Sequence, residues 1–419
     1  MPFINTPSLE QALALLAMPD EAHFSEAPER DRARVLRMVA AGVRSRPELV
    51  ERLGLRSTTA SRAVAALLER RLLVEASGEK QGRGRPAATL ALNPHRLGVS
   101  VIHAASRAFI GVLLGLDGSV VAREMLPVSQ DADNEAIGAA LAGLAGRLAA
   151  QAPPGMLHAG TVASVSGIVD GPRWLIASRW PRMRDFDIAA AIAPVAGPVD
   201  VVRQLDAEFR SRALADPAAY VEAVVLLHWG WGIGMAYGKG GEPFGVGAGP
   251  FGEIGHWRLE GLEERRCDCG RSGCLETSAA LWAMLPALRH RWPELSEDED
   301  ELLLQLPRLD LLALPDIRVA AHHMVRAMAN LSLILFPARI VINSPLLANA
   351  ALWAHVEALF RAAGSISGLP MPVLCNEPMP AARGIAGAAG PLMVRALEHM
   401  LRGPGQGPSG EDTTAPSAD

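Results

Sequence analysis

Three of the four cysteines in this 419-residue chain lie within eight residues of one another. The surrounding segment, residues 252–276, reads GEIGHWRLEGLEERRCDCGRSGCLE, and its histidine stands eleven residues before the first cysteine. One imidazole and three thiols are the set that a tetrahedral Zn²⁺ takes in a closed structural site. A disulfide framework would need an even set in a secreted chain, and the fourth cysteine, Cys375, lies about a hundred residues away. The predicted zinc ligands are His256, Cys267, Cys269 and Cys274.

The spacing of these residues favours a folded metal loop. Gly270 and Gly273 let the backbone turn back so that the third thiolate reaches the metal. The alternatives are scattered buried cysteines beside a chance histidine, and a redox C-x-C pair. Redox pairs usually have the spacing C-x-x-C beside a βαβ unit. Because four protein ligands leave no open position, the predicted zinc is structural and does not by itself indicate a catalytic function.

Charged residues are distributed unevenly along the chain. Residues 29–96 contain 15 Lys or Arg against 7 Asp or Glu, a net charge of +8, so the rest must carry −13 to give the overall −5. A basic module on an acidic body suggests that one end of the molecule meets a polyanion. At this length we expect two or three domains, and 49% hydrophobic residues indicate a globular chain.

The basic segment has the layout of a helix-turn-helix unit. Residues 29–42 place apolar residues at helical spacing with arginines on the outer face. The following SRPELVERLGL predicts a short helix with Ser45 as N-cap and Gly54 closing it. A second helix begins at Ser57 or Thr58, and polar and basic residues lie near its N-terminus, opposite its apolar stripe. In this layout the second helix enters the major groove of DNA.

The segment after these helices has the pattern of a wing. LLVEASGEKQGRGRPAATLAL contains two strand-like apolar runs around a loop rich in glycine and basic residues. Arginines between the glycines are suited to a minor groove or to phosphates. The alternative is a small helical packing module with a solvated basic face. We expect DNA contacts from Arg56, Thr58, Thr59, Ser61, Arg62, Arg83 and Arg85.

After the basic segment the sequence changes to strand patterns with helices between them. Residues 96–128 predict three strands, and GTVASVSGIVDG predicts another that ends in a loop containing Gly167. Residues 223–257 repeat the pattern of strand, glycine loop and strand, and ARIVINSPLL predicts a late buried strand. Helices such as 136–150 and 318–335 lie between them. Two β-meanders, each followed by helices, indicate a two-lobed α/β protein with a cleft.

The terminal segments and the composition indicate in which cellular compartment we expect the protein. The opening residues lack a basic region before their short apolar patch, and no stretch of eighteen uncharged apolar residues occurs. We therefore expect neither a signal peptide nor a membrane span. Few cysteines and no export signal favour the cytoplasm. Residues 1–28 predict an arm with a short helix around 8–17, and residues 403–419 lack apolar content, which predicts disorder.

The run GEIGH followed by CDCGRSGCLE resembles the signature of the ROK family, named for repressors, open reading frames and sugar kinases. The resemblance extends over roughly residues 97–401, and the preceding winged helix with GRGRP is similar to the repressor branch, of the xylose and N-acetylglucosamine repressor type. It implies an actin-like, hexokinase-like fold with a sugar cleft between lobes, and a zinc that braces the loop presenting sugar ligands. Without it, Glu253 and Glu276 would be interpreted as partners of the metal ligands. The residues expected at the sugar are Gly167, Glu253, His256 and Glu276, with His256 also on the zinc.

The family's sugar kinases use phosphate loops, and this sequence departs from each of them. Their acidic residue and Gly-Gly-Thr turn correspond here to Ser100 and to residues 103–105, His-Ala-Ala. The second phosphate loop has Trp231 between two glycines, and the adenosine strand ends in Asn-Ser-Pro instead of a glycine run. Without the glycines, backbone N–H groups cannot approach phosphates closely.

The catalytic base is also missing. The family's kinases carry Asn-Asp after a Pro-Val strand, and alignment on PVDVVRQLDAEF places Arg203 and Gln204 there. Neither side chain serves as a base near neutral pH. Asp206, two residues on, would take the role only if the strand were shifted in register. We therefore expect no catalytic residue.

The same departures bear on the class of ligand. Arg179, Arg182 and Arg203 could gather at the cleft, where guanidinium groups would suit a sugar acid or a sugar phosphate. The alternative is that they are solvated surface residues in an Arg-rich chain with only two lysines. A third possibility is that control by a ligand has been lost.

Together these features predict a cytoplasmic transcriptional repressor that binds a double-stranded DNA operator and responds to a sugar or an anionic sugar derivative, without kinase activity. The alternative is a sugar kinase of this family with an appended DNA-binding domain. Because paired winged helices bind half-sites about a helical turn apart, we expect a homodimer or a dimer of dimers. The predicted domains are an arm at 1–28, a winged helix at 29–96, a two-lobed body at 97–402 with zinc in its second lobe, and a tail at 403–419.

Overall fold

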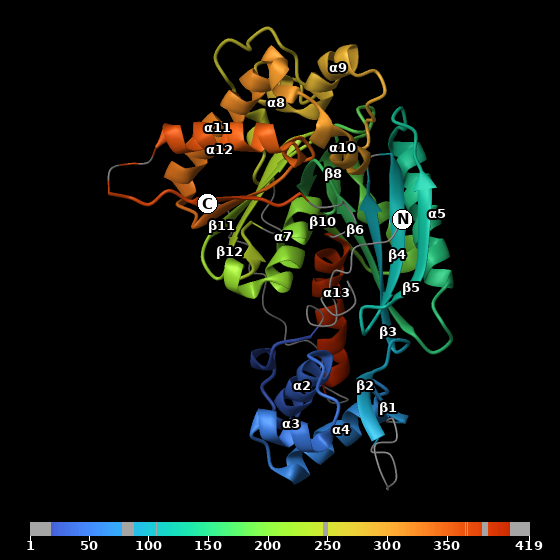
Figure 1. The fold of residues 1–419 in the computed structure, drawn as a ribbon. Helices are drawn as coiled ribbons and strands as arrows, with labels where there is room; N and C mark the ends of the chain where they lie inside the picture. Colours follow the sequence, from blue (N-terminus) through green and yellow to red (C-terminus); the bar gives the residue numbers. More distant parts are fainter. Residues whose placement is uncertain are drawn as a thin grey trace, which may run out of the picture.

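The computed structural model describes residues 18–77, 88–105, 107–245, 250–364, 366, 368–378 and 384–402. Our expectations for the helix around 8–17, for the wing loop at 78–87 and for the tail at 403–419 lie outside these residues. Figure 1 shows an N-terminal unit, drawn in blue, below two larger lobes. The C-terminal helix, drawn in red, runs from between the lobes to the N-terminal unit.

The described part of the N-terminal unit combines three α-helices with a two-stranded antiparallel sheet. Its elements are η1 (Glu21–His23), α2 (Ala27–Ala40), α3 (Arg46–Leu53), α4 (Ser57–Glu69), β1 (Leu73–Ser77) and β2 (Ala88–Leu92). As expected, the Ser45 hydroxyl caps α3 by accepting a backbone N–H at 3.4 Å, and Gly54 ends the helix with a left-handed φ of 62°. Leu36, Leu49 and Leu67 are fully buried and hold the three helices together.

The first lobe is built on a five-stranded mixed sheet in the order β10-β6-β3-β4-β5. Its elements are β3 (Leu97–Ala104), β4 (Ala108–Gly115), β5 (Val120–Pro127), α5 (Asn134–Ala150), β6 (Leu157–Val165), β7 (Ile168–Asp170), β8 (Arg173–Ile176), β9 (Arg184–Asp187), α6 (Ile188–Ala196), β10 (Val199–Arg203) and α7 (Gln204–Ala215). The first three strands form an antiparallel meander, whereas β6 runs parallel to β3, and β10 runs parallel to β6. Every residue of β3 is buried, as expected for a central strand covered on both faces.

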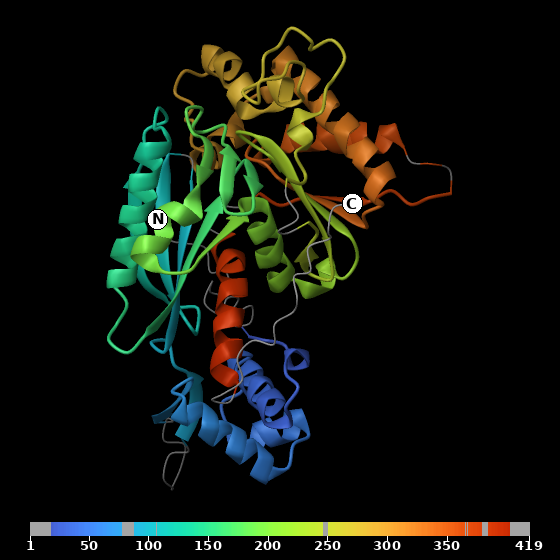
Figure 2. The same cartoon turned by 180° about the vertical axis from the view of Figure 1, so that it is seen from behind.

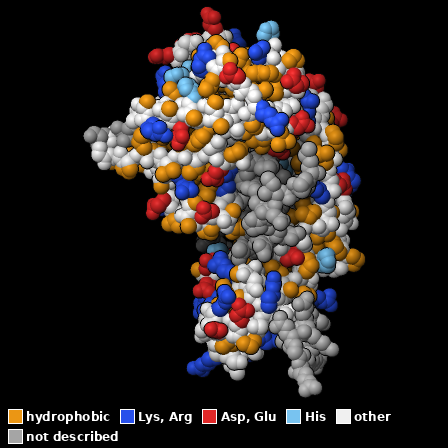
Figure 3. Space-filling model, in the orientation of Figure 1, with side chains coloured by type: hydrophobic (Ala, Val, Ile, Leu, Met, Phe, Trp, Pro, Cys, Tyr) orange, Lys and Arg blue, Asp and Glu red, His pale blue; other side chains and the backbone are white. Residues whose placement is uncertain are grey.

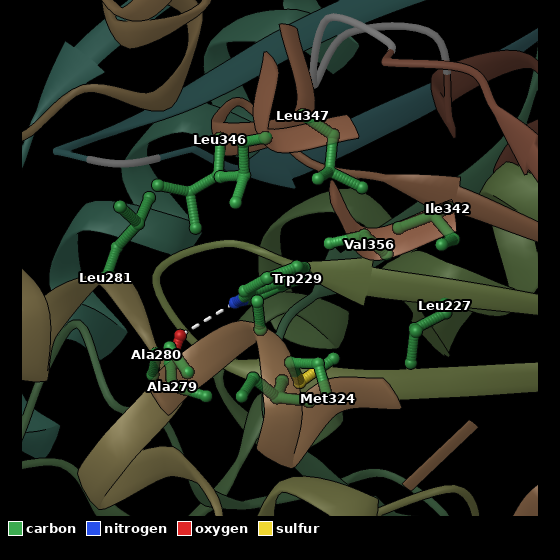
Figure 4. Packing of buried hydrophobic residues seen from close by; sticks show 14 of the residues in the cluster. Leu227, Trp229, Ala279, Ala280, Leu281, Met324, Ile342, Leu346, Leu347 and Val356 are labelled. Carbon is green, nitrogen blue, oxygen red and sulfur yellow. Dashed lines mark hydrogen bonds between the residues drawn. The ribbon is translucent and has the colours of Figure 1, made fainter. Parts of the chain in front are cut away.

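The second lobe repeats this topology in the order β13-β12-β11-β14-β15. Its elements are η2 (Pro217–Tyr220), β11 (Val224–Trp229), β12 (Ile233–Lys239), β13 (Glu242–Pro243), η3 (Ile254–His256), α8 (Glu276–Ala279), α9 (Leu281–Arg291), α10 (Glu299–Gln305), η4 (Leu306–Arg308), η5 (Leu311–Ala313), α11 (Pro315–Leu335), β14 (Arg339–Asn343), η6 (Leu346–Ala348), α12 (Ala350–Ala363) and β15 (Val373–Asn376). Figure 4 shows its core, in which the Trp229 indole donates to the carbonyl of Ala279 at 2.7 Å. Met324 of α11 and Val356 of α12 pack against the same side of the sheet.

The last helix, α13 (Gly384–Leu401), belongs to both parts of the molecule. It packs against α7, β3 and β6 of the first lobe, and its lower end meets α2. Figure 2 shows the same path from behind. A single hydrophobic core contains residues of the N-terminal helices, of β3 and of α13, among them Leu36, Val99 and Leu397.

The helices predicted at 136–150 and 318–335 correspond to α5 and α11, whose observed first residues are Asn134 and Pro315. Asp133 extends α5 because its carboxylate accepts the N–H of Ala136 at 3.1 Å. Across the described ranges, no helix is long and apolar enough to cross a membrane.

Candidate functional site

A cavity of about 190 Å³ lies between the two lobes. The first lobe lines it with the turn after β3, the loop after β6, and the start of α7. The second lobe contributes the turn between β11 and β12, the η3 segment, and the first turn of α10. All four residues expected at a ligand lie on this cavity: Gly167, Glu253, His256 and Glu276.

Gly167 lies in the turn between β6 and β7, and its position requires glycine. Its φ is +90°, and an added Cβ would overlap the carbonyl oxygen of Ile176. The backbone can therefore pass close to the cavity without a side chain filling it.

Glu253 is a carboxyl whose ionisation is suppressed by its surroundings. Burial raises its pKa to about 7, although Arg203 opposes this effect, and the charges of Glu276 and Asp206 add to it. The Arg203 Nη1 atom lies 3.9 Å from Glu253 Oε1, and 26% of the Glu253 side chain is exposed. Near neutral pH this group can accept or donate a hydrogen bond to a ligand hydroxyl.

Glu276 is fixed in place by the main chain. Its Oε1 atom accepts the N–H of Ile233 at 2.8 Å, and Trp282 Nε1 donates to its Oε2 atom at 3.4 Å. An added Cβ at Gly255 would lie 2.8 Å from Glu276 Oε1, so the glycine of the GEIGH run allows this close approach. Burial raises the pKa of Glu276.

The four predicted zinc ligands come together at the edge of the cavity. The nearest donor atoms of His256, Cys267, Cys269 and Cys274 all lie within 4.8 Å of one another. His256 Nδ1 is 3.6 Å from Cys267 Sγ, and the sulfurs of Cys269 and Cys274 are 3.7 Å apart. A tetrahedron with bonds of about 2.3 Å has edges of about 3.8 Å, so this donor set fits a zinc ion. Such a group could hold a metal.

The loop reaches this shape through its glycines and through short antiparallel bridges. Gly270 and Gly273 have φ values of +87° and +78°, as expected from the sequence. Isolated bridges pair Arg258 with Cys274 and Arg266 with Ser272, which brings the two ends of the loop together. The loop thus connects the His256 side of the cavity to Glu276 at the start of α8.

Arg203 and Gln204 are held by contacts within the protein. Arg203 donates two hydrogen bonds to Asp206, at 3.1 and 3.0 Å, and a third to the carbonyl of Met235 at 2.9 Å. Gln204 donates to the carbonyl of Ala104. Arg203 pairs with Val165 at the end of β10, and Asp206 lies in the first turn of α7. In this register Asp206 is the partner of Arg203 and does not line the cavity.

Glu299, a residue that the sequence did not single out, also lines the cavity and contacts several groups there. Its Oε1 atom accepts the N–H of Trp231 at 2.5 Å, and its Oε2 atom lies 3.3 Å from His228 Nε2. Burial would raise the pKa of Glu299, but the charge of His228 prevails and lowers it to about 2. The guanidinium of Arg179 lies 3.6 Å from the centre of the Trp231 ring and 4.0 Å from Glu299. In the sequence this glutamate belongs to the acidic run SEDEDE, which is typical of a solvated face.

Two of the three arginines considered for an anionic ligand line the cavity. Arg179 and Arg203 do so and are buried, whereas Arg182 is exposed, lies 3.8 Å from Asp133 and is absent from the lining. The carboxylates on the lining outnumber the arginines: Glu208, Glu253, Asp268, Glu276, Glu299 and Asp300.

The expected DNA contacts fall partly within the described residues. Arg56 precedes α4, and Thr58, Ser61 and Arg62 are exposed on its first turns, with Thr59 half-buried. Ala60, Val64 and Leu67 on the opposite side are buried, which orients α4 as predicted. Figure 3 shows Lys and Arg side chains over the N-terminal unit. Arg83 and Arg85 lie outside the described residues.

Comparison with known proteins identifies related chains. The profile of the ROK family matches residues 102–389. A xylose repressor of Bacillus subtilis (strain 168) is 24% identical over 257 residues, which cover 60% of this chain and 66%, just under two thirds, of that protein. A xylose repressor of Bacillus spizizenii (strain W23) is 22% identical over 365 residues, which cover 85% of this chain and 92% of that protein.

Solved structures share the fold. A ROK family transcriptional regulator, described as a homologue of the E. coli MLC protein, has a TM-score of 0.66 at 21% identity. The match covers 89% of this chain and 98% of that one. A ROK hexokinase from Thermus thermophilus has a TM-score of 0.54 at 23% identity, covering 72% of this chain and 98% of the other. At these identities the likeness concerns the fold alone.

Proposed function

The chain belongs to the ROK family, as its sequence predicts, and on that premise we propose that it is a DNA-binding transcriptional repressor controlled by a sugar in the cleft. The observation that carries this proposal is the joining of an N-terminal unit, which presents a polar and basic helix, to a cavity between two lobes, at which Arg203 and Gln204 occupy the positions of the kinases' Asn-Asp pair. The repressors among its relatives, one of them matching 85% of this chain, support the same assignment.

The charges of α3 and α4 support a DNA-binding role for α4. In the helix before it, Arg52 lies 3.1 Å from Glu48, and Arg46 lies 2.7 Å from Glu75. Within the described residues, neither Arg56 nor Arg62 has a carboxylate at ion-pair distance. Guanidinium groups without such partners remain available for phosphates and guanine edges. The wing arginines Arg83 and Arg85 stay a prediction.

For the ligand we propose an uncharged sugar. Arg203 is already neutralised by Asp206, and Arg179 lies beside Glu299, while further carboxylates face the cavity. On the described lining Arg203, Arg179 and His228 each lie near a carboxylate, so an anionic sugar derivative would compete with those carboxylates, at a cost that grows with burial. Glu253 and Glu276, with Gly167 and His256, would instead receive sugar hydroxyls.

The competing assignment is a sugar kinase with an appended DNA-binding domain, and kinases are among the structural neighbours. Against it, Gln204 cannot take a proton, and Asp206 is occupied by two hydrogen bonds from Arg203. Turnover of ATP against a panel of neutral sugars separates the two. We expect no turnover above the background of a Glu253→Ala variant, and sugar-dependent turnover lost in that variant would favour the kinase.

The zinc that we propose at His256 and the three cysteines would be structural. Burial raises the pKa of the Cys267 and Cys274 thiols, and a bound cation would favour their thiolate forms. A metal supplies the positive charge that holds thiolates in a tetrahedron and thereby fixes the loop beside Glu276.

A second copy of this chain is the partner that we propose for the exposed apolar end of α11. Leu333, Ile334 and Phe336 are 47%, 66% and 59% exposed there. Val373 of the edge strand β15 is 59% exposed and donates its N–H to the carbonyl of Ala338 at 3.0 Å, so it lies beside them. Apolar clusters of this kind commonly mark protein interfaces. A dimer would offer two winged helices to a palindromic operator.

The decisive experiment on function is the capture of genomic DNA fragments by the full chain, followed by sequencing of the retained fragments. We expect a short palindromic sequence that the Arg56→Ala, Arg62→Ala double variant no longer enriches. Recovery of the same random fragments by both proteins would contradict the repressor assignment. A protein that binds chromosomal DNA must be located in the same compartment as the chromosome. We therefore propose, on the same grounds, that this protein is located in the cytoplasm.

A further inference from the structure

The C-terminal helix α13 joins the cleft to the N-terminal unit. Its 18 residues, Gly384–Leu401, make a rod of about 27 Å at 1.5 Å per residue. Gly384 at its upper end lines the cavity between the lobes. Leu397 and Leu401 at its lower end are fully buried in the core shared with α2 and α4. Figures 1 and 2 show this course from opposite sides.

The upper end of α13 is packed too closely against α7 to slide past it. An added Cβ at Gly387 would overlap the carbonyl oxygen of Ala207. The Gly387 N–H donates to Ser211 Oγ at 2.8 Å in a fully packed contact. Because α7 begins at Gln204 and carries Glu208, both on the cavity lining, a shift of α7 at the cleft must move α13 with it.

The lower end of α13 is held by side chains of the N-terminal unit. The last carbonyls of a helix have no donors within the helix, and cations near them are favourable. Arg32 donates from Nε and Nη2 to the carbonyl of Leu401, at 3.1 and 2.5 Å, and Arg70 Nε donates to the carbonyl of Met400 at 3.2 Å. His23 lies 2.5 Å from Glu398 on the same turn.

These contacts place one rigid element between the ligand cavity and the helices that would face DNA. We infer that α13 is the element through which the state of the cleft reaches the DNA-binding unit, with Arg32 and Arg70 as the positioning residues that grip its C-terminal carbonyls. The inference rests on the proposed function and names its route of regulation. A ligand that shifts α7 changes the position of α13. The hydrogen bonds from Arg32 and Arg70 to the end of α13 then change the orientation of α2 and α4. The free energy that couples ligand binding to the orientation of α2 and α4 equals the difference in the ligand's binding free energy between the two orientations.

The test is a double-mutant cycle on the full chain, with one change at each end of α13. Ser211→Ala removes the hydrogen bond at the upper end, and Arg70→Ala removes one at the lower end. Hydrogen exchange of the α2 and α4 amides is measured for wild type, both single variants and the double variant. We expect Ser211→Ala alone to accelerate hydrogen exchange in α2 and α4 by about threefold or more. In the double variant with Arg70→Ala, we expect exchange no faster than in Arg70→Ala alone. Sites this far apart give additive effects unless an element joins them.

The controls separate this inference from the function. Arg361→Ala, at an exposed i,i+4 pair with Glu357 on α12, should leave exchange in α2 and α4 unchanged. Gly387→Ala gives a second, stronger perturbation of the upper end. Unchanged exchange in α2 and α4 for both upper-end variants, or additive effects, would overturn the inference even if the chain binds its operator. Failure of wild type to bind any genomic fragment, with the non-additive exchange intact, would overturn the repressor assignment and leave the coupling standing.

Discussion

Glu253 is a cleft residue whose pKa is raised into the neutral range by burial. Because its pKa is raised from 4.5 to about 7, the folded state holds a proton that the unfolded chain releases between these pH values. This group therefore lowers stability as pH rises through that window, by at most about 3 kcal/mol. We predict that Glu253→Gln is as stable as wild type at pH 4 and more stable at pH 8, measured by urea unfolding at each pH.

Glu260, an exposed glutamate seven residues further on, provides the matched control. Glu260→Gln should shift stability little at either pH. If the stability gained by Glu253→Gln were the same at both pH values, the carboxyl would titrate normally in the folded protein.

Arg62 is the residue whose replacement should change the choice of DNA sequence. It is exposed on the second turn of α4, where a recognition helix contacts base edges. We predict that Arg62→Ala lowers affinity for the operator by about 1–3 kcal/mol and relaxes preference at one position. The measurement is binding to operators with each base varied in turn. Arg52→Ala, which loses only an exposed pair with Glu48, serves as the control, and an equal loss there would count against the assignment.

Among the elements, the loop from His256 to Cys274 is the one for which we propose a structural zinc. We predict about one Zn²⁺ per chain by metal analysis. Cys269→Ser, or removal of the metal with a chelator, should lower the melting temperature by about 5 °C or more, because structural zinc contributes directly to folding. Cys375→Ser, which changes a cysteine outside the cluster, should keep both the metal and the melting temperature. A metal-free protein with unchanged melting would contradict the zinc assignment.

The elements that the sequence predicted well are those whose signals are local. The cap at Ser45, the turn at Gly54 and the helical periodicity of α5 and α11 depend on neighbours within a few residues, and each appears in the structure. The zinc ligands also carry a local pattern of spacing. The cavity residues Glu208 and Glu299 could not be found in this way, because they reach the cleft only through the packing of helices distant in sequence.

The docking of α13 was equally beyond local patterns. Its sequence, GIAGAAGPLMVRALEHML, is rich in small residues and contains Pro391, and nothing in it says that one end meets α7 and the other meets α2. The contacts with the N-terminal unit join residues more than 300 positions apart, such as Arg70 and Met400, and those with α7 join residues such as Ser211 and Gly387, which are 176 positions apart. These contacts exist only in the folded chain, so no local sequence pattern predicts them.

At the scale of the whole molecule, binding in the cleft should change the affinity for DNA. A thermal-shift screen of neutral pentoses, hexoses and their acids should find a neutral sugar, because a ligand of the folded state raises the melting temperature. We predict that this sugar weakens operator binding by wild type, and that Glu253→Ala loses the response while keeping operator affinity. The readout is operator affinity with and without the sugar, and a fully responsive variant would place the effector elsewhere.

The assembly is the second property at this scale. We predict that Ile334→Glu, at the exposed end of α11, converts a dimer into monomers and weakens binding to a palindromic operator more than to a half-site. Sedimentation at several concentrations measures the change. Val120→Glu, at a 47% exposed residue of β5, is the matched control, and an equal effect there would argue against the α11 surface.

The contact of α13 with the N-terminal helices also governs the order in which a newly made chain can mature. Ribosomes add about 5–20 residues per second, so roughly 20–70 s separate the synthesis of α2 from that of α13. During that time the side of α2 that will receive Leu397 and Leu401 has no partner from the end of the chain. The N-terminal unit is synthesised first, but its hydrophobic core is completed only when α13 has been synthesised. A chain whose translation stops before Gly384 lacks the helix that connects α2 and α4 to the cleft, so the coupling that we propose requires full-length synthesis.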